Sequence, residues 1–295
     1  NVIFMSPDLE QPSVWKTNLS FDTELPWWGA VFSAELLLTE VKTGLAYDRL
    51  VIGTPTGVGQ DGRLLYWRDP VTGGGGARAN RDSRFGDVIL LRPTDKGGTH
   101  QLTFGLGKPV DVVWGWSLSY TWTDATEVSP LLSSTATSNF NNRSIFQPNE
   151  DVASTSNFEI KDRVLGTITW HHNFFSDYRT EVSAVYEGRS GRPYSWVYSN
   201  DTNGESRTND LFYVPGGRGD VLFTGGAAME DAFFQYLSTT DLVHNMGSVV
   251  SRNSARAGWV NSFDLRISQE LPGFFEGHKS QIWFDIQDVG NLLNK

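Results

Sequence analysis

The sequence predicts an all-β protein, and more specifically a partial transmembrane antiparallel β-barrel with about eight long strands. Three observations lead to this prediction. Strands with alternating apolar and polar residues recur along the 295 residues. The connections between these strands alternate between short and long. No apolar run approaches the roughly 18 residues that a membrane-spanning helix needs.

The composition excludes several classes of protein. The chain has no cysteine, so it cannot form a disulfide scaffold, a thiolate metal site or a cysteine nucleophile. It carries 34 acidic and 24 basic residues, which give a formal net charge of −10, and its bases do not form a concentrated patch. Nucleic acid is therefore not an expected partner, because binding its phosphates needs such a patch.

The clearest strand runs from Val110 to Trp122. Its apolar face consists of Val110, Val112, Trp114, Trp116, Leu118, Tyr120 and Trp122. Its other face consists of the small or polar residues Asp111, Val113, Gly115, Ser117, Ser119 and Thr121. A tilted strand crosses a bilayer with about 9 to 11 residues, so this segment is long enough to span a membrane.

The other expected strands follow the same alternating pattern. Before the clearest strand come Trp15–Phe21, Phe32–Leu38 running on toward Ile52, and Val88 together with Leu102–Leu106. After it come Val164–Trp170, Tyr178–Glu187, Trp259–Leu271 and Ile282–Gln287. Charged residues alternate with apolar ones in the later strands, which is typical of a wall with lipid on one side and water on the other.

The connections form two groups by length. Short links are expected at 25–28, 107–110, 172–177 and 271–279, and long ones at 53–84, 123–157 and 199–258. The longest link holds the only helix-like stretch, Ala228–Leu237. Short turns on one side and long loops on the other are typical of outer-membrane barrels, which have short periplasmic turns and longer extracellular loops.

Paired aromatic residues occur in three of the short links. They are Trp27 with Trp28, Phe174 with Phe175, and Phe274 with Phe275. Amphipathic rings at strand ends suit the interfacial girdle of a membrane barrel. Buried corner aromatics of a soluble barrel would show the same pattern, so this observation favours the girdle without excluding the alternative.

Two constellations of residues suggest binding sites. Oxygen-bearing side chains concentrate in the longest loop at Asp201, Asn203, Glu205 and Asp210, which predicts a Ca²⁺ site, although the spacing is not that of an EF-hand loop. The alternative is a turn capped by these side chains. Seven tryptophans could serve as sugar-stacking platforms: Trp67, Trp114, Trp116, Trp122, Trp170, Trp196 and Trp259. Three of these share a face with aliphatic residues, so lipid or core contact is the simpler interpretation.

Motifs for covalent chemistry do not occur, so we expect no enzyme activity. His171 and His172 are adjacent in a strand and point to opposite faces, which makes a shared metal ion difficult. The segment 188–191 has the letters Gly-Arg-Ser-Gly, which is not the nucleophile elbow of a hydrolase.

Several motifs resemble the barrel of Oar-like TonB-dependent receptors. The most specific are 186–194 (Tyr-Glu-Gly-Arg-Ser-Gly-Arg-Pro-Tyr) and 209–215 (Asn-Asp-Leu-Phe-Tyr-Val-Pro). Supporting pieces are 102–109 (Leu-Thr-Phe-Gly-Leu-Gly-Lys-Pro), 116–122 (Trp-Ser-Leu-Ser-Tyr-Thr-Trp) and 288–295 (Asp-Val-Gly-Asn-Leu-Leu-Asn-Lys). The resemblance spans most of the chain and identifies residues 1–295 as an internal segment of such a barrel, with the plug domain and the final strands absent.

The resemblance implies a large barrel of about 22 strands in a Gram-negative outer membrane. It further implies a plug domain that couples to the TonB system, lipid and lipopolysaccharide as neighbours, and uptake or export of a large or scarce solute. The residues expected to face the lumen are Asp111, Arg179, Glu181, Glu187, Asp264, Arg266 and Glu270. Such charges tune selectivity, or simply hydrate the wall and pair with a plug. Two alternatives are a secreted soluble β-protein that binds glycans and a small structural barrel or adhesin.

Overall fold

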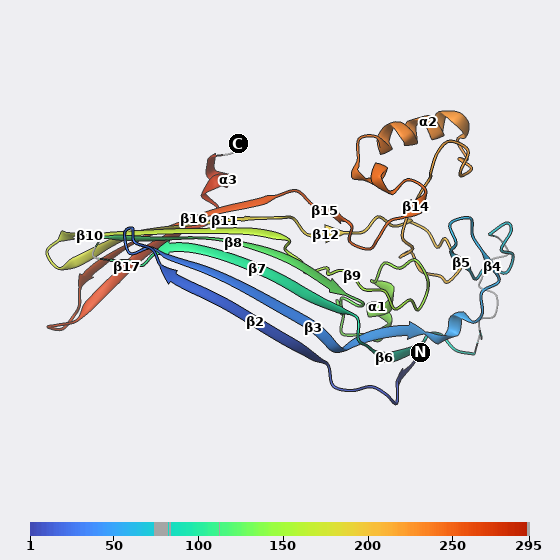
Figure 1. Ribbon diagram of the computed structural model, residues 1–295, viewed down its shortest axis with the longest axis horizontal. Coiled ribbons are helices and arrows are strands. Elements are labelled where there is room, and N and C mark those ends of the chain that lie inside the picture. Colours follow the sequence, from blue (N-terminus) through green and yellow to red (C-terminus); the bar gives the residue numbers. More distant parts are fainter. Residues whose placement is uncertain (74–81, 83, 112, 294–295) are drawn as a thin grey trace.

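The computed structural model describes residues 1–73, 82, 84–111 and 113–293, and it is dominated by one large, mainly antiparallel sheet (Figure 1). Its long strands are β2 (Ser13–Glu24), β3 (Val31–Arg49), β7 (Gly97–Lys108), β8 (Trp114–Glu127), β10 (Asp162–Phe175), β11 (Tyr178–Arg189), β16 (Val260–Pro272) and β17 (Lys279–Ile286). Each of these strands pairs with the next in chain order. The all-β prediction and its eight long strands are therefore confirmed within the described residues.

Shorter elements complete the chain. The remaining strands are β1 (Val2–Met5), β4 (Gly57–Val58), β5 (Leu64–Leu65), β6 (Val88–Thr94), β9 (Ser154–Thr155), β12 (Pro193–Tyr194), β13 (Tyr213–Val214), β14 (Ser248–Val249) and β15 (Ala255–Arg256). The helices are α1 (Ala136–Asn141), α2 (Gly226–Leu237), α3 (Val289–Leu293) and the 3₁₀ turns η1 (Leu50–Ile52) and η2 (Asp241–Asn245). None of the described helices is long and apolar enough to cross a membrane.

The sheet is open. Among the described residues, β2 pairs only with β3 and β17 pairs only with β16, so the two outer strands of the long series do not meet. At the other end of β3, residues 44–49 pair with β6 in place of β7, and β6 in turn pairs with β1 in parallel. The chain therefore forms a curved wall rather than a closed barrel.

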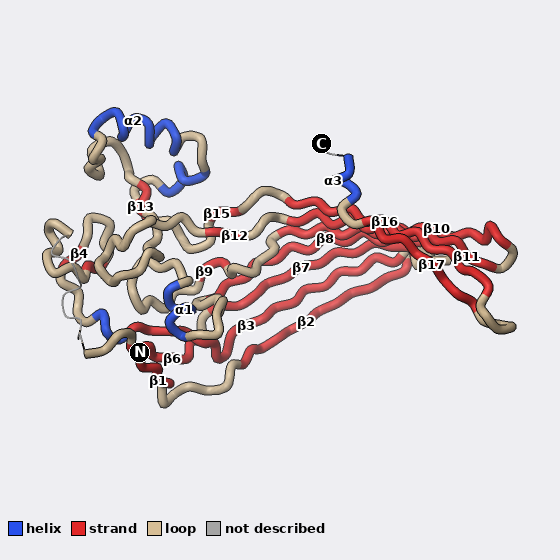
Figure 2. Tube along the Cα trace, turned by 180° about the vertical axis from the view of Figure 1, so that it is seen from behind, coloured by secondary structure: helices blue, strands red, loops and turns tan. Residues whose placement is uncertain are grey.

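The lengths of the connections divide the molecule into two ends. Short turns join β2 to β3, β7 to β8, β10 to β11 and β16 to β17 at one end, which we call the turn end. The three long connections, 50–96, 128–161 and 190–259, gather at the opposite end, which we call the loop end (Figure 2). This arrangement is the one that the alternating lengths predicted.

The hydrophobic core lies in the loops and not under the sheet. One buried cluster joins Leu211, Val214, Leu237, Leu242 and Val250, with Phe233 and Phe234 of α2 packed against it. A second joins Ile89, Ala136, Phe140 and Ile145. Because these clusters draw on all three long connections, the loops fold into a compact cap on the loop end of the sheet.

Two details differ from the sequence prediction. The clearest strand begins at Trp114 instead of Val110, because Asp111 caps a turn there, and Val112 lies outside the described residues. The short helices α1 and α3 were not expected; Thr135 caps α1 by accepting from the N–H of Ser138. Asn294 and Lys295, the last residues of one family-like motif, also lie outside the described residues.

Candidate functional site

The strand register collects the apolar residues of the long strands on one face. Residues directly opposite each other in an antiparallel pair share a face, and Trp116 lies opposite Ile168 as Leu118 lies opposite Leu106. Carried across the sheet, this face comprises Leu19, Phe21, Phe32, Leu36, Leu102, Phe104, Leu106, Trp114, Trp116, Leu118, Tyr120, Trp122, Ile168, Trp170, Val182, Tyr186, Phe263, Leu265, Ile267, Ile282, Phe284 and Ile286. We call it the apolar face.

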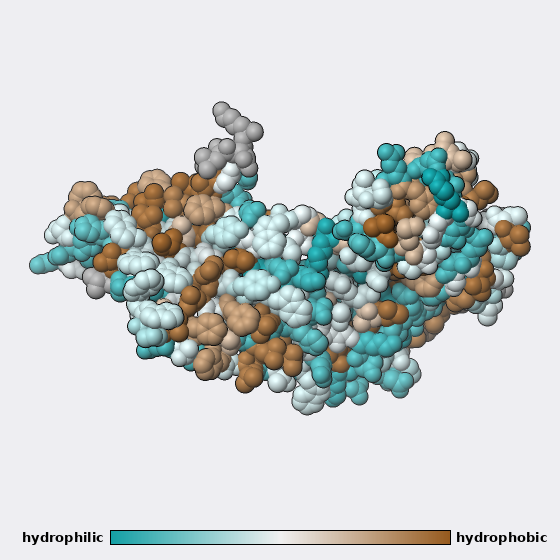
Figure 3. Space-filling model, turned by 45° about the horizontal axis from the view of Figure 1, so that its top comes forward, coloured by the Kyte–Doolittle hydropathy of each residue, from teal (hydrophilic) through white to brown (hydrophobic). Residues whose placement is uncertain are grey.

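No part of the described chain forms a layer over the apolar face. Leu118, at the middle of β8, is 50% exposed, and Leu19 on β2 and Phe284 on β17 are more exposed still. Apolar side chains gather over the part of the surface that the sheet forms, whereas the region where the loops begin is more polar (Figure 3). A continuous exposed patch of this extent is far larger than soluble monomers carry, so the face requires an apolar neighbour.

The aromatic pairs of the turns are exposed as well. Trp28 is 77% exposed and Phe274 is 97% exposed, and their neighbours Trp27 and Phe275 are also on the surface. The pair Phe174 and Phe175 lies at the same end of the sheet. The alternative of buried corner aromatics is therefore wrong, and the rings form an exposed rim at the turn end.

Six of the seven predicted lumen residues share the opposite, polar face of the sheet. Arg179, Glu181 and Glu187 lie on β11, and the residues opposite Glu181 and Glu187 on β16 are Ser268 and Ser262. The same face of β16 carries Asp264, Arg266 and Glu270.

These charges are mostly paired across strands. The guanidinium of Arg266 donates to both carboxylate oxygens of Asp285 on β17, at 2.5 and 2.8 Å. Glu270 accepts from Lys279 at 2.8 Å and from the N–H of Arg179 at 3.1 Å. Arg163 and Glu187 form a further pair at 2.7 Å. The polar face thus carries charges of both signs, most of them paired.

Asp111, the seventh predicted residue, does not lie on a strand face. It occupies the turn between β7 and β8, where it accepts from the N–H groups of Val113 and Trp114 at 2.8 and 3.0 Å and pairs with Lys108. These interactions hold the pKa of Asp111 well below its ordinary range, with the bond from Lys108 as the main cause. Its observed role is to cap the turn.

Hydroxyl groups fill the middle of the polar face. Ser117 and Thr167 are 2.7 Å apart, Thr103 and Thr121 are 3.1 Å apart, and Thr169 and Ser183 are 3.2 Å apart. The polar face also carries hollows, one of about 320 Å³ beside Arg266 and Asp285 and one of about 380 Å³ between β7, β8 and residues 156–160. The polar face can therefore accommodate a solute.

A buried charge network holds the loop cap together. Arg63 and Asp210 pair at 2.8 Å, and both side chains are inaccessible to solvent. Asp87 bridges two cations, Arg49 at 2.7 Å and Arg207 at 2.8 Å. Breaking a buried pair costs about 3 to 5 kcal/mol because it leaves one charge without compensation, so these contacts hold the connection 190–259 against the connection 50–96.

The four residues predicted to bind Ca²⁺ lie together in this cap, but three of them have other partners. The carboxylate of Asp201 accepts from the N–H groups of Gly204 and Ser206, and Asn203 accepts from that of Glu205. Asp210 is bound to Arg63 and to the N–H of Thr202. Among the described residues, no three His, Cys, Asp or Glu side chains stand in a metal-binding arrangement. Ca²⁺ binding stays a prediction.

Glu205 is the exception among the four. It is 0% exposed, and neither of its carboxylate oxygens has a hydrogen-bond partner among the described residues. Burial, reinforced by the charge of Asp210, raises the pKa of Glu205 to about 8. The carboxyl group is therefore protonated at neutral pH.

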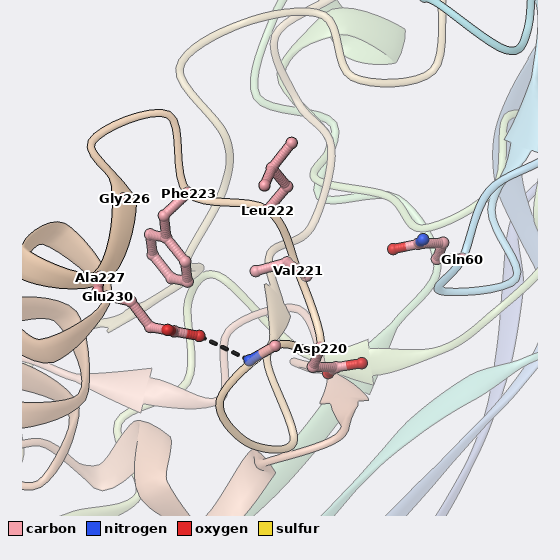
Figure 4. Close-up of a pocket in the computed structure, with 9 residues that line it drawn as sticks. Gln60, Asp220, Val221, Leu222, Phe223, Gly226, Ala227 and Glu230 are labelled. Carbon is pink, nitrogen blue, oxygen red and sulfur yellow. Dashed lines mark hydrogen bonds between the residues drawn. The ribbon is translucent and has the colours of Figure 1, made fainter.

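Another hollow, of about 380 Å³, lies on the outside of the cap (Figure 4). Glu230 of α2 accepts from the N–H of Gly219 at 2.7 Å and so closes the segment 219–223 against the helix. Leu222 is 96% exposed beside it, and Gln60 of the β4–β5 hairpin faces it from the other side. The hollow has no buried polar group that would define a ligand.

The tryptophans do not form a common platform. Trp114, Trp116, Trp122 and Trp170 belong to the apolar face, whereas Trp196 packs against the core of the cap. Trp67 donates to the carbonyl of Thr202 in the loops. His171 is buried and His172 stacks between Trp170 and Phe174, so the two imidazoles occupy different environments.

No family model matches this chain, and no curated protein matches it.

The sequence did not reveal two features of the loop end. One is the set of ion pairs that hold the cap together, and the other is the hollow on β7 and β8. Arg63 and Asp210 are 147 positions apart, so no local pattern connects them. Gln101 lies on β7 and Phe158 lies in the connection between β9 and β10, so the two residues that line the hollow meet only in the folded chain. The one feature of the sequence that pointed toward the hollow was the alternation of residues, which places Gln101 on the polar face.

Proposed function

We propose that this chain is part of the wall of a TonB-dependent receptor in a Gram-negative outer membrane, and that it lines the path of a large or scarce solute. The observation that carries the proposal is the uncovered apolar face, which spans all eight long strands. The hydrocarbon core of a bilayer is the neighbour that suits such a face, because strands are paired internally and expose only side chains to lipid.

In this arrangement the turn end is periplasmic and the loop end is extracellular. The aromatic rim then lies at the periplasmic surface of the outer membrane, where lipid meets water and amphipathic rings are enriched. Its members are Trp27, Trp28, Phe174, Phe175, Phe274 and Phe275. The polar face with Arg179, Glu181, Glu187, Asp264, Arg266 and Glu270 lines the lumen. The cap meets the solute first, close to lipopolysaccharide.

The open edges at β2 and β17 are where further strands complete the barrel. Lipid cannot satisfy the N–H and C=O groups of an unpaired edge, so neighbouring strands of the complete receptor close the wall. Coupling to TonB passes through a plug domain, and the chain itself performs no covalent chemistry.

Site-directed labelling tests the orientation of the wall. The chain has no cysteine, so single cysteines along β8 report one position each. With nitroxide labels in lipid vesicles, we expect positions 116, 118 and 120 to collide preferentially with O₂, and positions 117, 119 and 121 with a water-soluble nickel chelate. Equal accessibility on both faces would refute the proposal.

A further inference from the structure

A hollow at the loop end of the polar face is built differently from the rest of that face. It lies over β7 and β8, has a volume of about 380 Å³ and is covered on one side by residues 156–160. Ser156 anchors this covering segment by donating its N–H to the carbonyl of Ala125 at 2.8 Å. Volumes of about 300 to 1,000 Å³ are typical of small-molecule sites, so the hollow has room for a ligand.

The floor of the hollow offers hydrogen-bonding groups that no described side chain uses. Gln101 lies directly opposite Thr123 on the polar face, and Thr99 lies one row further toward the loops. Of the side chains in the described structure, none forms a hydrogen bond with these three. Within the same part of the structure, the guanidinium of Arg163 donates only through Nε, to Glu187.

An exposed aromatic ring forms the wall of the same hollow. Phe158 is 64% exposed and belongs to the covering segment. The ring does not contribute to the hydrophobic core of the loops, since Phe158 belongs to neither buried cluster. A ring beside unused amide and hydroxyl groups offers one apolar surface and several donors and acceptors together.

The charges at the hollow are already neutralised. Arg163 pairs with Glu187 at 2.7 Å, and the buried Glu159 pairs with Arg256. An anionic ligand such as a phosphate or a carboxylate would need an unpaired cation, and a cationic ligand would need an unpaired carboxylate. The hollow therefore suits a neutral ligand.

We propose that this hollow binds a neutral oligosaccharide, with a sugar ring stacked on Phe158 and its hydroxyl groups bonded to Gln101, Thr99, Thr123 and Arg163. A pyranose has a face of C–H groups that packs on an aromatic ring and an edge of hydroxyl groups that both donate and accept. The inference deepens the proposed function by naming the class of solute, and it rests on that function for the role in transport.

Titration with neutral trisaccharides tests the site. The chain in detergent micelles is titrated with maltotriose, cellotriose, xylotriose and N,N′,N″-triacetylchitotriose, with citrate and glucose 1-phosphate as charged probes. We expect saturable binding of at least one neutral sugar and at least tenfold weaker binding by Phe158→Ala. Gln101→Leu, which preserves size, should weaken binding severalfold.

Phe85→Ala is the matched control, because Phe85 is an exposed ring in another connection, and it should bind as the unchanged chain does. The site is overturned if no trisaccharide binds, if Phe158→Ala binds with unchanged affinity, or if a charged probe binds more tightly than every sugar. Liposome flotation of the same proteins, after the detergent is removed in the presence of lipid, separates the two proposals. A chain that binds sugar without floating contradicts the membrane wall, and one that floats without binding contradicts the site.

Discussion

Glu205 is a carboxylic acid buried where no described group donates a hydrogen bond to it. Its position follows from the turn around it: Asn203 accepts from the N–H of Glu205, and Gly204 has φ +87° with its backbone against Trp67. The guanidinium of Arg49 donates to the backbone carbonyl of Glu205 and forms no hydrogen bond with its carboxyl group. A single titratable side chain thus links the stability of the cap to pH.

Replacing Glu205 with Gln should stabilise the cap at alkaline pH. The pKa of Glu205 in the folded protein is about 8, above its ordinary value of 4.5. Below the ordinary pKa both states are protonated and the group has no effect. As pH rises toward 8, the unfolded state ionises first, so the folded state loses stability. The neutral Gln avoids this loss.

Thermal unfolding followed by tryptophan fluorescence measures this effect. The melting temperature of Glu205→Gln should exceed that of the unchanged chain increasingly between pH 5 and 8. Glu276→Gln, at an exposed position of a short turn, should track the unchanged chain at every pH. Parallel pH profiles for all three proteins would contradict a protonated, buried Glu205.

At the scale of the element, β8 shows how one strand serves two environments. Trp116 faces Ile168 on the apolar face, and its neighbour Ser117 bonds to Thr167 on the polar face. The same alternation was visible in the sequence, and it survives the later start of the strand at Trp114 because the period of two is unaffected.

Arginine at position 116 should destabilise the membrane-inserted chain much more than arginine at position 117. A charge on the lipid side costs about 2 to 4 kcal/mol near the bilayer midplane, whereas the lumen side is hydrated. The comparison is Trp116→Arg with Ser117→Arg in a denaturant titration of the chain refolded into lipid vesicles. Equal losses of unfolding free energy at the two positions would remove the assignment of faces.

The longest connection poses a different question, which is whether Ca²⁺ orders it. Asp201 already accepts from the backbone N–H groups of a turn, and Asp210 pairs with Arg63, so the turn interpretation explains the observed geometry. Calcium binding predicts that chelation increases proteolytic cleavage between Asn200 and Gly219. Limited proteolysis with Ca²⁺ and with EDTA decides between the capped turn and the Ca²⁺ site. Identical cleavage patterns under the two conditions would rule out the Ca²⁺ site.

At the scale of the whole molecule, the sheet and the cap differ in whether their apolar surface is buried within the chain. The cap buries its own clusters, whereas no described residue covers the apolar face of the sheet or pairs with its edges at β2 and β17. Stability of the wall therefore depends on what surrounds it.

In water the isolated chain should associate, and in detergent or lipid it should remain dispersed. Unpaired strand edges template further pairing, and the exposed face adds an apolar surface. Size-exclusion chromatography with multi-angle light scattering, in buffer with and without detergent, measures the difference. A monodisperse, heat-resistant monomer in plain buffer would instead favour the soluble glycan-binding protein.

Local patterning by itself determined the strands, their two faces and the two ends of the molecule. Alternation in segments such as Trp114–Trp122 has a period that only a strand can use, and the lengths of the connections fixed which ends hold turns and loops. The capping role of Asp111 was missed because the alternation in the sequence continues from Trp114 back to Val110, although β8 begins only at Trp114 and Asp111 lies in the turn before it.

Only the tertiary structure decided the contents of the loop end. The pairs Arg63 with Asp210 and Asp87 with Arg207 each join the connection 50–96 to the connection 190–259. The hollow of Gln101, Thr123 and Phe158 depends on the register of β7 with β8 and on where the segment 156–160 folds back. Periodicity is a property of neighbouring residues, so it reveals faces. Burial of charge and the shape of a site come from residues brought together by long-range pairing, which no short segment records.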